Sequence, residues 1–259
     1  MGKQIQVEIR GAIVILTLSN LPLNLLNNAL KNELYSLLEQ IKGRQELRAL
    51  VLTGEGERAF SAGADMKEFA RRIEENTAGS AWEWGHRTVD LAAQMPQVLI
   101  AGINGQAFGG GLEVAMMCDI ILCSDAAKVG LPEVKRGIMP GNGGVEALFW
   151  RCGYAKAVEL LTTGRLLSAQ EALAYGVVDQ VHPADKLLGR SLALAEDIAA
   201  SPGLAVSGIK ATLCRYKARN RRAARKFGSD MFAALHQTTD CAEGVSAFFE
   251  KRDAVYTHR

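Results

Sequence analysis

The segment Gly105-Gln106-Ala107-Phe108-Gly109-Gly110-Gly111-Leu112-Glu113 follows the short apolar run Val98 to Ile103 and opens a helix-like pattern that ends at Met117. A strand, a glycine-rich turn and a helix in this order indicate an α/β layer structure. Glycine lets backbone N–H groups approach a ligand closely, and a helix N-terminus favours negative charge there. Glu113 follows this turn, and Glu133 lies in a second glycine-containing turn, Gly130-Leu131-Pro132-Glu133. Two such carboxylates can divide acid and base roles, so they are the candidate catalytic pair.

A further turn, Ala59-Phe60-Ser61-Ala62-Gly63-Ala64-Asp65-Met66-Lys67, follows the strand-like run Arg48 to Thr53 and also enters a helix. Two turns of this kind can aim two N–H groups at one oxygen and form an oxyanion hole. Taken alone, three consecutive glycines are as often a flexible turn, and Glu113 is as often a first-turn charge favoured by the helix dipole.

The period of the apolar residues changes along the chain. Ile5 to Ile9 and Ala12 to Leu18 predict a hairpin around Arg10-Gly11, and Asn27 to Ile41 predicts an amphipathic helix. Strand and helix patterns then alternate, and helical patterns dominate after Gly143. Pro202-Gly203 is the predicted boundary between a core, residues 1–200, and a C-terminal helical region, residues 201–259, which we expect to pack on the core or on a neighbouring subunit.

The bulk composition gives no reason to expect a nucleic-acid or membrane partner. The chain has 259 residues, 48% of them hydrophobic, and a formal net charge of +2. Eight basic residues and no acidic one lie between Lys210 and Lys226, which predicts a solvated helical face, with an anion or nucleic-acid contact as the minority interpretation. The five cysteines have no CxxC pairing and the four histidines lack ligand spacing, so we expect a reduced, cytoplasmic protein without a metal. The N-terminus has no apolar signal region, and no apolar run has transmembrane length.

Several common catalytic sites are excluded by the motifs. No Gly-Lys-Ser/Thr follows the glycines, and their spacing does not match the dinucleotide fingerprint. Ser61 lacks the nucleophile-elbow pattern, which argues against a serine hydrolase.

In this order, the motifs resemble the crotonase superfamily, the enoyl-CoA hydratase/isomerase family. The resemblance covers almost the whole chain and rests on the following segments: Pro22 to Leu26, Ala59 to Asp65, Asn104-Gly105, Gly109 to Glu113, Cys118-Asp119, Leu131 to Glu133, Pro140 to Gly144, Leu161 to Gly164 and Phe249 to Arg252. It implies a crotonase-like spiral of repeated ββα units with a C-terminal helical oligomerisation region, assembled as a homotrimer or as a hexamer of two trimers.

The resemblance also implies the site. The N–H groups of Ala64 and Gly110 would bind the thioester oxygen, Glu113 would act as base toward a water, Glu133 would protonate the α-carbon, and Gly141 would add a backbone contact near that water. The residues implied to bind the acyl-CoA substrate are Asn24, Leu25, Ala62, Gly63, Asp65, Met66, Gly109, Trp82 and Trp84. The implied reaction is reversible hydration of a 2-enoyl-CoA, with no metal and no cofactor, coenzyme A being part of the substrate.

Two other kinds of function are compatible with these motifs. Double-bond isomerisation needs a base at the position of Glu133 and can dispense with Glu113, and the same fold supports other acyl-CoA reactions. A non-enzymatic CoA-binding or RNA-binding protein that uses the basic run is a reading of a different class. The chain also departs from the family where Gln97-Val98 replaces the common Lys-Pro, which puts one basic contact near CoA in doubt.

Overall fold

Two β-sheets form the centre of the molecule. The computed structural model describes residues 3–201, 203–217, 230, 232–234 and 236–255. The large sheet contains, in spatial order, β1 (Ile5–Arg10), β2 (Ile13–Leu18), β3 (Ala49–Gly54), β5 (Val98–Ile103), β7 (Ile120–Ser124) and β10 (Gln180–His182). β1 and β2 are antiparallel, as the predicted hairpin requires, and the other neighbours in this sheet are parallel.

The small sheet consists of short strands, three of which directly follow strands of the large sheet. Its order is β4 (Ala59–Ser61), β6 (Gln106–Phe108), β8 (Lys128–Gly130) and β9 (Leu167–Ser168). Thus β3 leads to β4, β5 to β6 and β7 to β8, and a helix follows each pair. This repetition is the expected spiral of ββα units. The strands of the small sheet were not predicted, because two or three residues are too few to show a period.

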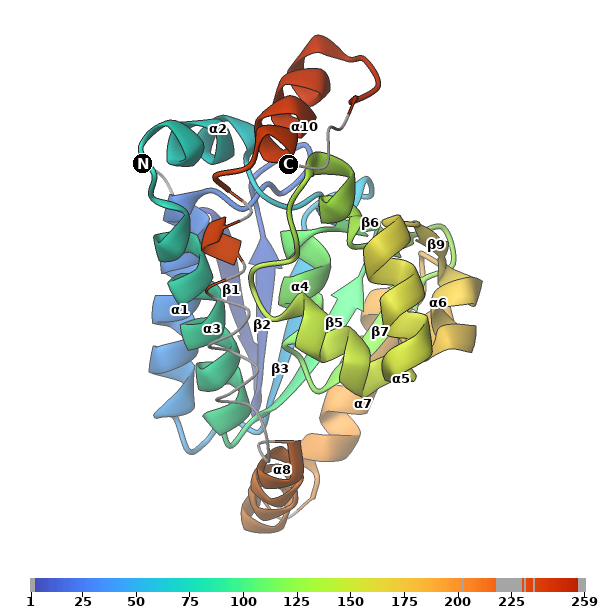
Figure 1. Ribbon diagram of the computed structural model, residues 1–259. Helices are drawn as coiled ribbons and strands as arrows, with labels where there is room; N and C mark the ends of the chain where they lie inside the picture. The colour runs from blue at the N-terminus through green and yellow to red at the C-terminus, as the bar shows by residue number, and fades with distance from the viewer. Residues whose placement is uncertain (1–2, 202, 218–229, 231, 235, 256–259) are drawn as a thin grey trace.

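Helices surround both sheets (Figure 1). They are α1 (Asn28–Lys42), α2 (Met66–Glu74), α3 (Ala78–Gln94), α4 (Gly110–Met116), the 3-10 helix η1 (Pro132–Arg136), α5 (Gly144–Thr163), α6 (Ala169–Tyr175), α7 (Leu187–Ala199), α8 (Gly203–Lys217) and α10 (Thr239–Glu250). The Asn27 side chain accepts a hydrogen bond from the Leu30 N–H and caps α1. α5 is broken at Gly153 by a backbone with φ 77° and ψ 169°.

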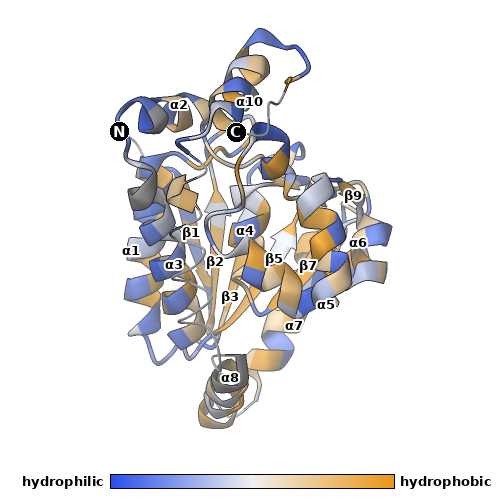
Figure 2. Cartoon of the chain, viewed as in Figure 1, coloured by the Kyte–Doolittle hydropathy of each residue, from blue (hydrophilic) through white to orange (hydrophobic). Residues whose placement is uncertain are grey.

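Both faces of the large sheet are buried along β2, β3 and β5. Val14 and Leu16 point into the main core with α1, α3, α4 and α5, while Ile13 and Ile15 alternate to the opposite face and pack with residues of α7. Hydrophobic residues accordingly follow β2, β3 and β5 along their length (Figure 2). This double cover fixes the carboxyl ends of the strands, where the turns that carry the candidate site begin.

The described C-terminal helices pack on the core of their own chain. α8 contacts α3 and β5, and α10 contacts η1, where a Cβ on Gly244 would lie only 2.5 Å from Arg136 Cα. The predicted boundary at Pro202-Gly203 stays a prediction, and most of the helix expected over Arg222 to Gln237 lies outside the described residues. Within the described chain no single helix is long and apolar enough to cross a membrane, although the bent pair α7 and α8 passes a test of length and composition together.

In the basic run between Lys210 and Lys226, the structure describes the contacts of the Lys210 side chain. Lys210 is buried on α8, where its Nζ lies 2.7 Å from Asp119 Oδ2 and donates to the Gln97 carbonyl at 2.8 Å. Gln97 in turn donates to the carbonyls of Ile41 and Arg44. Lys210 therefore ties the tail to the core. The other basic side chains of the run lie outside the described part of the structure.

Candidate active site

Glu113 is buried in the first turn of α4 and is held by three N–H donors. Its Oε1 accepts from the backbone N–H groups of Asn142 at 2.7 Å and Gly144 at 2.9 Å, and its Oε2 accepts from the Asn142 side-chain amide at 2.8 Å. Burial raises the pKa of Glu113, and these three hydrogen bonds oppose the rise because they stabilise the carboxylate. Gly144 allows the approach, since a Cβ there would lie 2.8 Å from Glu113 Oε1.

In the described part of the chain, Glu133 lacks hydrogen-bond donors of the kind that hold Glu113. It lies in the first turn of η1, and its Oε2 is buried without a hydrogen-bond partner among the described residues. Burial, followed by the charge of Glu113, raises the pKa of Glu133 to about 8. The structure thus provides one carboxyl group whose ionised form is favoured by three donors and one whose protonated form is favoured by the lack of a donor to its buried Oε2 in the described structure.

Two backbone amide groups lie close together near this pair. Leu26 and Ala64 form a parallel bridge in which the Leu26 N–H donates to Gly63 and the Asp65 N–H to Leu26, so the Ala64 N–H takes no part in it. Gly110 begins α4, where an N–H has no partner within the helix. A Cβ on Gly110 would lie 3.9 Å from Ala64 N. The two N–H groups are thus close enough to serve one oxygen atom.

The glycines beside these amides have backbones that favour glycine. Gly63 has φ 97°, and a Cβ on it would lie 2.7 Å from the Phe108 carbonyl oxygen. Gly109 has φ 53°, and a Cβ on it would lie 3.1 Å from Glu133 Oε1. The turn therefore brings bare backbone against the Glu133 carboxyl group.

One cavity of about 540 Å³ joins the glutamates to the amides. Of the residues predicted for the site, it is lined by Glu113, Glu133, Ala64, Gly110, Gly141, Leu25, Ala62, Gly63, Asp65, Met66 and Gly109. Residues more than 100 positions apart in the chain thus meet, because the turns after β4, β6 and β8 lie at one edge of the small sheet.

Three predicted binding residues do not line this cavity. Asn24 is fully buried and donates from its side chain to the carbonyls of Glu55 and Ala59, so it holds two loops together. Trp82 stacks 5.2 Å from Phe232, which itself lines the cavity. Trp84 packs against α1 and donates from Nε1 to the Lys31 carbonyl at 3.0 Å.

Sequence reasoning did not identify several residues of the cavity: Asn142, Lys31, Arg72, Phe232, Phe248 and Phe249. Asn142 lies in the quoted Pro140 to Gly144 motif, and its amide was a visible signal. Lys31 also had a visible signal. It lies seven residues before Leu38, on the same buried face of α1, where a lysine is unusual. Phe249 begins the quoted Phe249 to Arg252 motif. Arg72, Phe232 and Phe248 had no signal, since their place in the cavity follows from tertiary packing.

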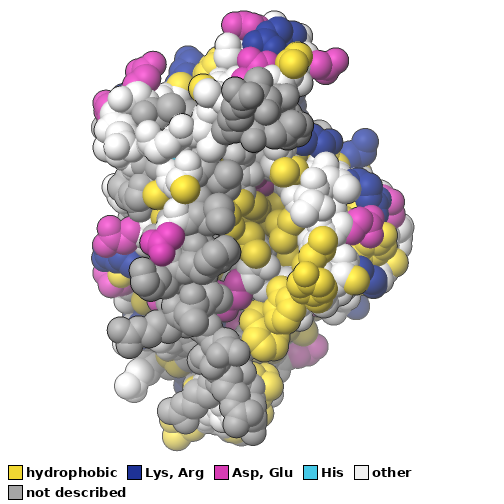
Figure 3. Space-filling view, viewed as in Figure 1, with side chains coloured by type: hydrophobic (Ala, Val, Ile, Leu, Met, Phe, Trp, Pro, Cys, Tyr) yellow, Lys and Arg dark blue, Asp and Glu magenta, His cyan; other side chains and the backbone are white. Residues whose placement is uncertain are grey.

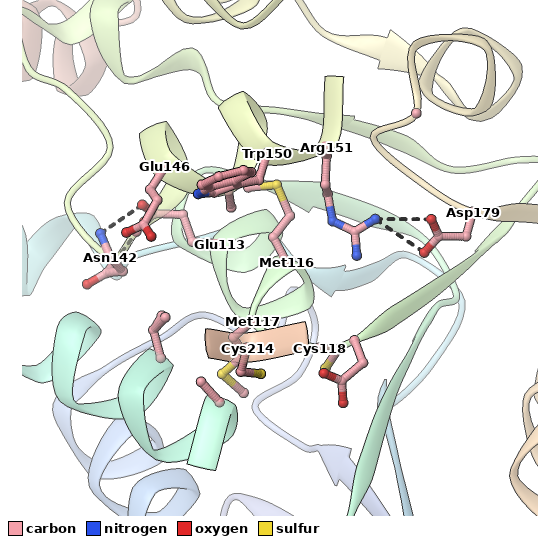
Figure 4. Close-up of a pocket in the computed structure, with 16 residues that line it drawn as sticks. Glu113, Met116, Met117, Cys118, Asn142, Glu146, Trp150, Arg151, Asp179 and Cys214 are labelled. Carbon is pink, nitrogen blue, oxygen red and sulfur yellow. Dashed lines mark hydrogen bonds and ion pairs between the residues drawn. The ribbon is translucent and has the colours of Figure 1, made fainter. Parts of the chain in front are cut away.

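A second cavity of about 330 Å³ lies on the other side of Glu113 (Figure 4). Glu113, Asn142 and Glu146 gather at one end of it, and the Arg151–Asp179 ion pair, with atoms 3.2 Å apart, lies at the other. Met116, Met117 and Cys118 lie between these ends. Glu113 therefore forms part of the wall between the two cavities. No group of three or more His, Cys, Asp or Glu residues in the described chain is placed to hold a metal.

Comparisons with known proteins agree on one family. A family model described as enoyl-CoA hydratase/isomerase matches residues 8–259. A protein of Rhizobium meliloti named probable enoyl-CoA hydratase is 38% identical over 98% of this chain and 97% of its own length. Among solved structures, a carnitinyl-CoA hydratase from Mycobacterium avium has a TM-score of 0.89 and 31% identity, with 100% of both chains covered. Pseudomonas aeruginosa DspI has a TM-score of 0.79 and 32% identity, covering 98% of this chain and 97% of its own.

Proposed function

The chain belongs to the enoyl-CoA hydratase/isomerase family, and on this premise we propose that it catalyses reversible syn addition of water to a 2-enoyl-CoA thioester, giving a 3-hydroxyacyl-CoA. The observation that carries the proposal is the contrast between the two glutamates. Glu113 is held by three N–H donors, and Glu133 has a buried oxygen without a donor. Their environments separate a base from an acid, as addition of water across a double bond requires.

In this mechanism the thioester oxygen accepts hydrogen bonds from the N–H groups of Ala64 and Gly110. Negative charge develops on that oxygen as the water oxygen attacks the β-carbon, and two fixed N–H groups stabilise it. Glu113 takes a proton from the attacking water, and Glu133 delivers its proton to the α-carbon. Water addition changes no net oxidation state, so the proposed reaction needs no redox cofactor.

Isomerisation of the double bond is the second candidate within the family. It needs a single group that moves a proton between carbons, a role that Glu133 alone could fill. The three donors on Glu113 favour hydration, because they hold a second carboxylate in the same cavity.

The test is loss of the conjugated thioester absorbance when purified protein is mixed with 2-enoyl-CoA esters of different acyl groups. The variants Glu113→Gln and Glu133→Gln preserve shape and remove the acid–base chemistry, so each should abolish the loss. Full activity in both variants would overturn the assignment. Movement of the double bond without water uptake, followed by NMR, would establish the isomerase.

We also propose that the protein assembles as a homotrimer or as a hexamer of two trimers in the cytoplasm. Support for assembly comes from α5, whose Phe149, Trp150 and Tyr154 are 45%, 48% and 74% exposed. Hydrophobic side chains gather on the face of the molecule where α5 lies (Figure 3). Patches of this kind are typical of protein interfaces. Light scattering after gel filtration should give a mass three or six times 27.9 kDa.

A further inference from the structure

Two buried cationic side chains line the cavity that holds the glutamates. Lys31 from α1 and Arg72 from α2 are 4% and 8% exposed. Lysine and arginine are almost never buried to this degree unless they are paired, because transfer of a charge out of water is unfavourable. An acyl pocket made only for a hydrocarbon chain would need neither of them.

The protein supplies little negative charge to this pair. Arg72 Nε and Nη2 are buried and have no hydrogen-bond partner among the described residues. The carboxylate paired with Arg72 is that of Glu68, whose Oε2 lies 3.8 Å from Nη2, beyond hydrogen-bond distance. That oxygen already accepts the Asn28 N–H at 3.0 Å. In the described structure the guanidinium group is therefore short of acceptors.

Lys31 is held in place without an ion pair to any described carboxylate. Its Nζ lies 5.3 Å from the centre of the Trp84 ring, and its carbonyl accepts the Trp84 Nε1–H at 3.0 Å. Burial, followed by the charge of Arg72, lowers the pKa of Lys31 to about 8. An anion bound between the two groups would relieve both the burial and the repulsion.

Stabilisation of Glu113 alone does not account for the pair. The charge of Lys31 acts on the Glu113 carboxylate, but Arg72 is not among the groups that shift Glu113. Arg72 and Phe69 both enter the cavity wall from α2, so this part of the wall combines an apolar ring with a buried cation.

Building on the hydratase function proposed above, we propose that Lys31 and Arg72 form a subsite for a carboxylate at the distal end of the acyl chain. The substrate is then a 2-enoyl-CoA whose acyl group is itself an acid. Trp84 is a positioning residue of this subsite, since it holds Lys31 by a ring contact and a hydrogen bond.

The experiment compares esters that differ only at the distal end of the chain. Hex-2-enoyl-CoA is paired with 5-carboxypent-2-enoyl-CoA, and pent-2-enoyl-CoA with 4-carboxybut-2-enoyl-CoA. For at least one pair, kcat/KM should be about 10²-fold higher for the acid, because charge-assisted hydrogen bonds form to groups that otherwise stay buried and unsatisfied. 4-Trimethylammoniobut-2-enoyl-CoA should be a poor substrate, since its cation would meet two others.

The variant Arg72→Met should reduce the preference for the acid ester about 10-fold to 100-fold, and Arg72→Lys should restore part of it. Arg71→Met is the matched control, because Arg71 lies on the same helix with its side chain 59% exposed and does not line the cavity. It should leave both activity and preference unchanged. A preference for the acid ester that Arg72→Met leaves unchanged would overturn the subsite.

Binding separates this proposal from the hydratase assignment. Adipyl-CoA and hexanoyl-CoA cannot be hydrated, and calorimetry gives their affinities whether or not the protein is a hydratase. Tighter binding of adipyl-CoA that Arg72→Met abolishes would support the subsite even if no enoyl ester reacts. Equal affinities, together with no preference in turnover, would refute it.

Discussion

Removal of the Asn142 side chain should change the pH dependence of the reaction in a defined direction. Asn142→Ala deletes the Nδ2 donor that lies 2.8 Å from Glu113 Oε2 and keeps the backbone N–H that binds Oε1. A hydrogen bond to a charged group contributes about 1.5–3 kcal/mol. The lost bond stabilised the ionised form of Glu113, so its pKa rises in the variant. At 1.36 kcal/mol per unit, the acidic limb of the pH–rate profile should move up by about 1 to 2 pH units.

The assay is kcat/KM for one 2-enoyl-CoA ester across the pH range, because this parameter reports ionisations of the free enzyme. Below the limb the variant should be about 10-fold to 100-fold slower than the wild type, and at higher pH it should approach it. Asn32→Ala removes the same chemical group from the exposed surface of α1 and serves as the control. A uniform loss of rate with an unmoved acidic limb would refute the reasoning, since Asn142 would then act on something other than the ionisation of Glu113.

Three further predictions follow from single contacts. Gly109→Ala places a Cβ 3.1 Å from Glu133 Oε1 at a backbone φ of 53°. We expect kcat to fall about 10-fold to 100-fold while the circular dichroism spectrum stays unchanged. A variant with the kcat of the wild type would show that the Glu133 carboxyl group can move aside freely. The pKa of Glu133 is about 8 in the folded protein against 4.5 as the ordinary value, so ionisation in the unfolded chain destabilises the fold as pH rises between these values. The Tm gain of Glu133→Gln over wild type should therefore grow from pH 5 to pH 8, and a constant difference would contradict this. Lys210→Met leaves Asp119 without its ion-pair partner and should lower the free energy of unfolding by about 3 kcal/mol in urea titrations, whereas an unchanged midpoint would show that the pair adds nothing.

Much of the fold could be predicted from residue patterns, because long elements leave a period in the sequence. The hairpin of β1 and β2, the helix α1 and the strand β5 were predicted at nearly their observed bounds. The strands of the small sheet could not be predicted, since they are held by neighbours from distant parts of the chain and have too few residues for alternation.

Part of the candidate site could also be predicted from residue patterns, and part of it could not. Glu113, Glu133 and the two glycine turns are contiguous motifs, so they could be identified before the structure was known. Three features of the site depend on how the helices pack and could not be predicted. Asn142 donates to Glu113, Trp84 packs on α1 instead of lining the cavity, and Lys31 lies near Arg72. Lys31 and Arg72 are 41 residues apart in the sequence, so no local sequence pattern indicates that they lie in the same cavity.

The position of α10 has a consequence for the order in which the chain is made. Phe248 and Phe249 complete the apolar wall of the cavity, and α10 rests on η1, the helix that carries Glu133. A ribosome that has synthesised residues 1–238 has therefore produced both glutamates and both candidate oxyanion amides, but not the two phenylalanines of this wall. The acid–base groups therefore precede α10 in synthesis, and a nascent chain gains this apolar wall of the cavity only after α10 has been made.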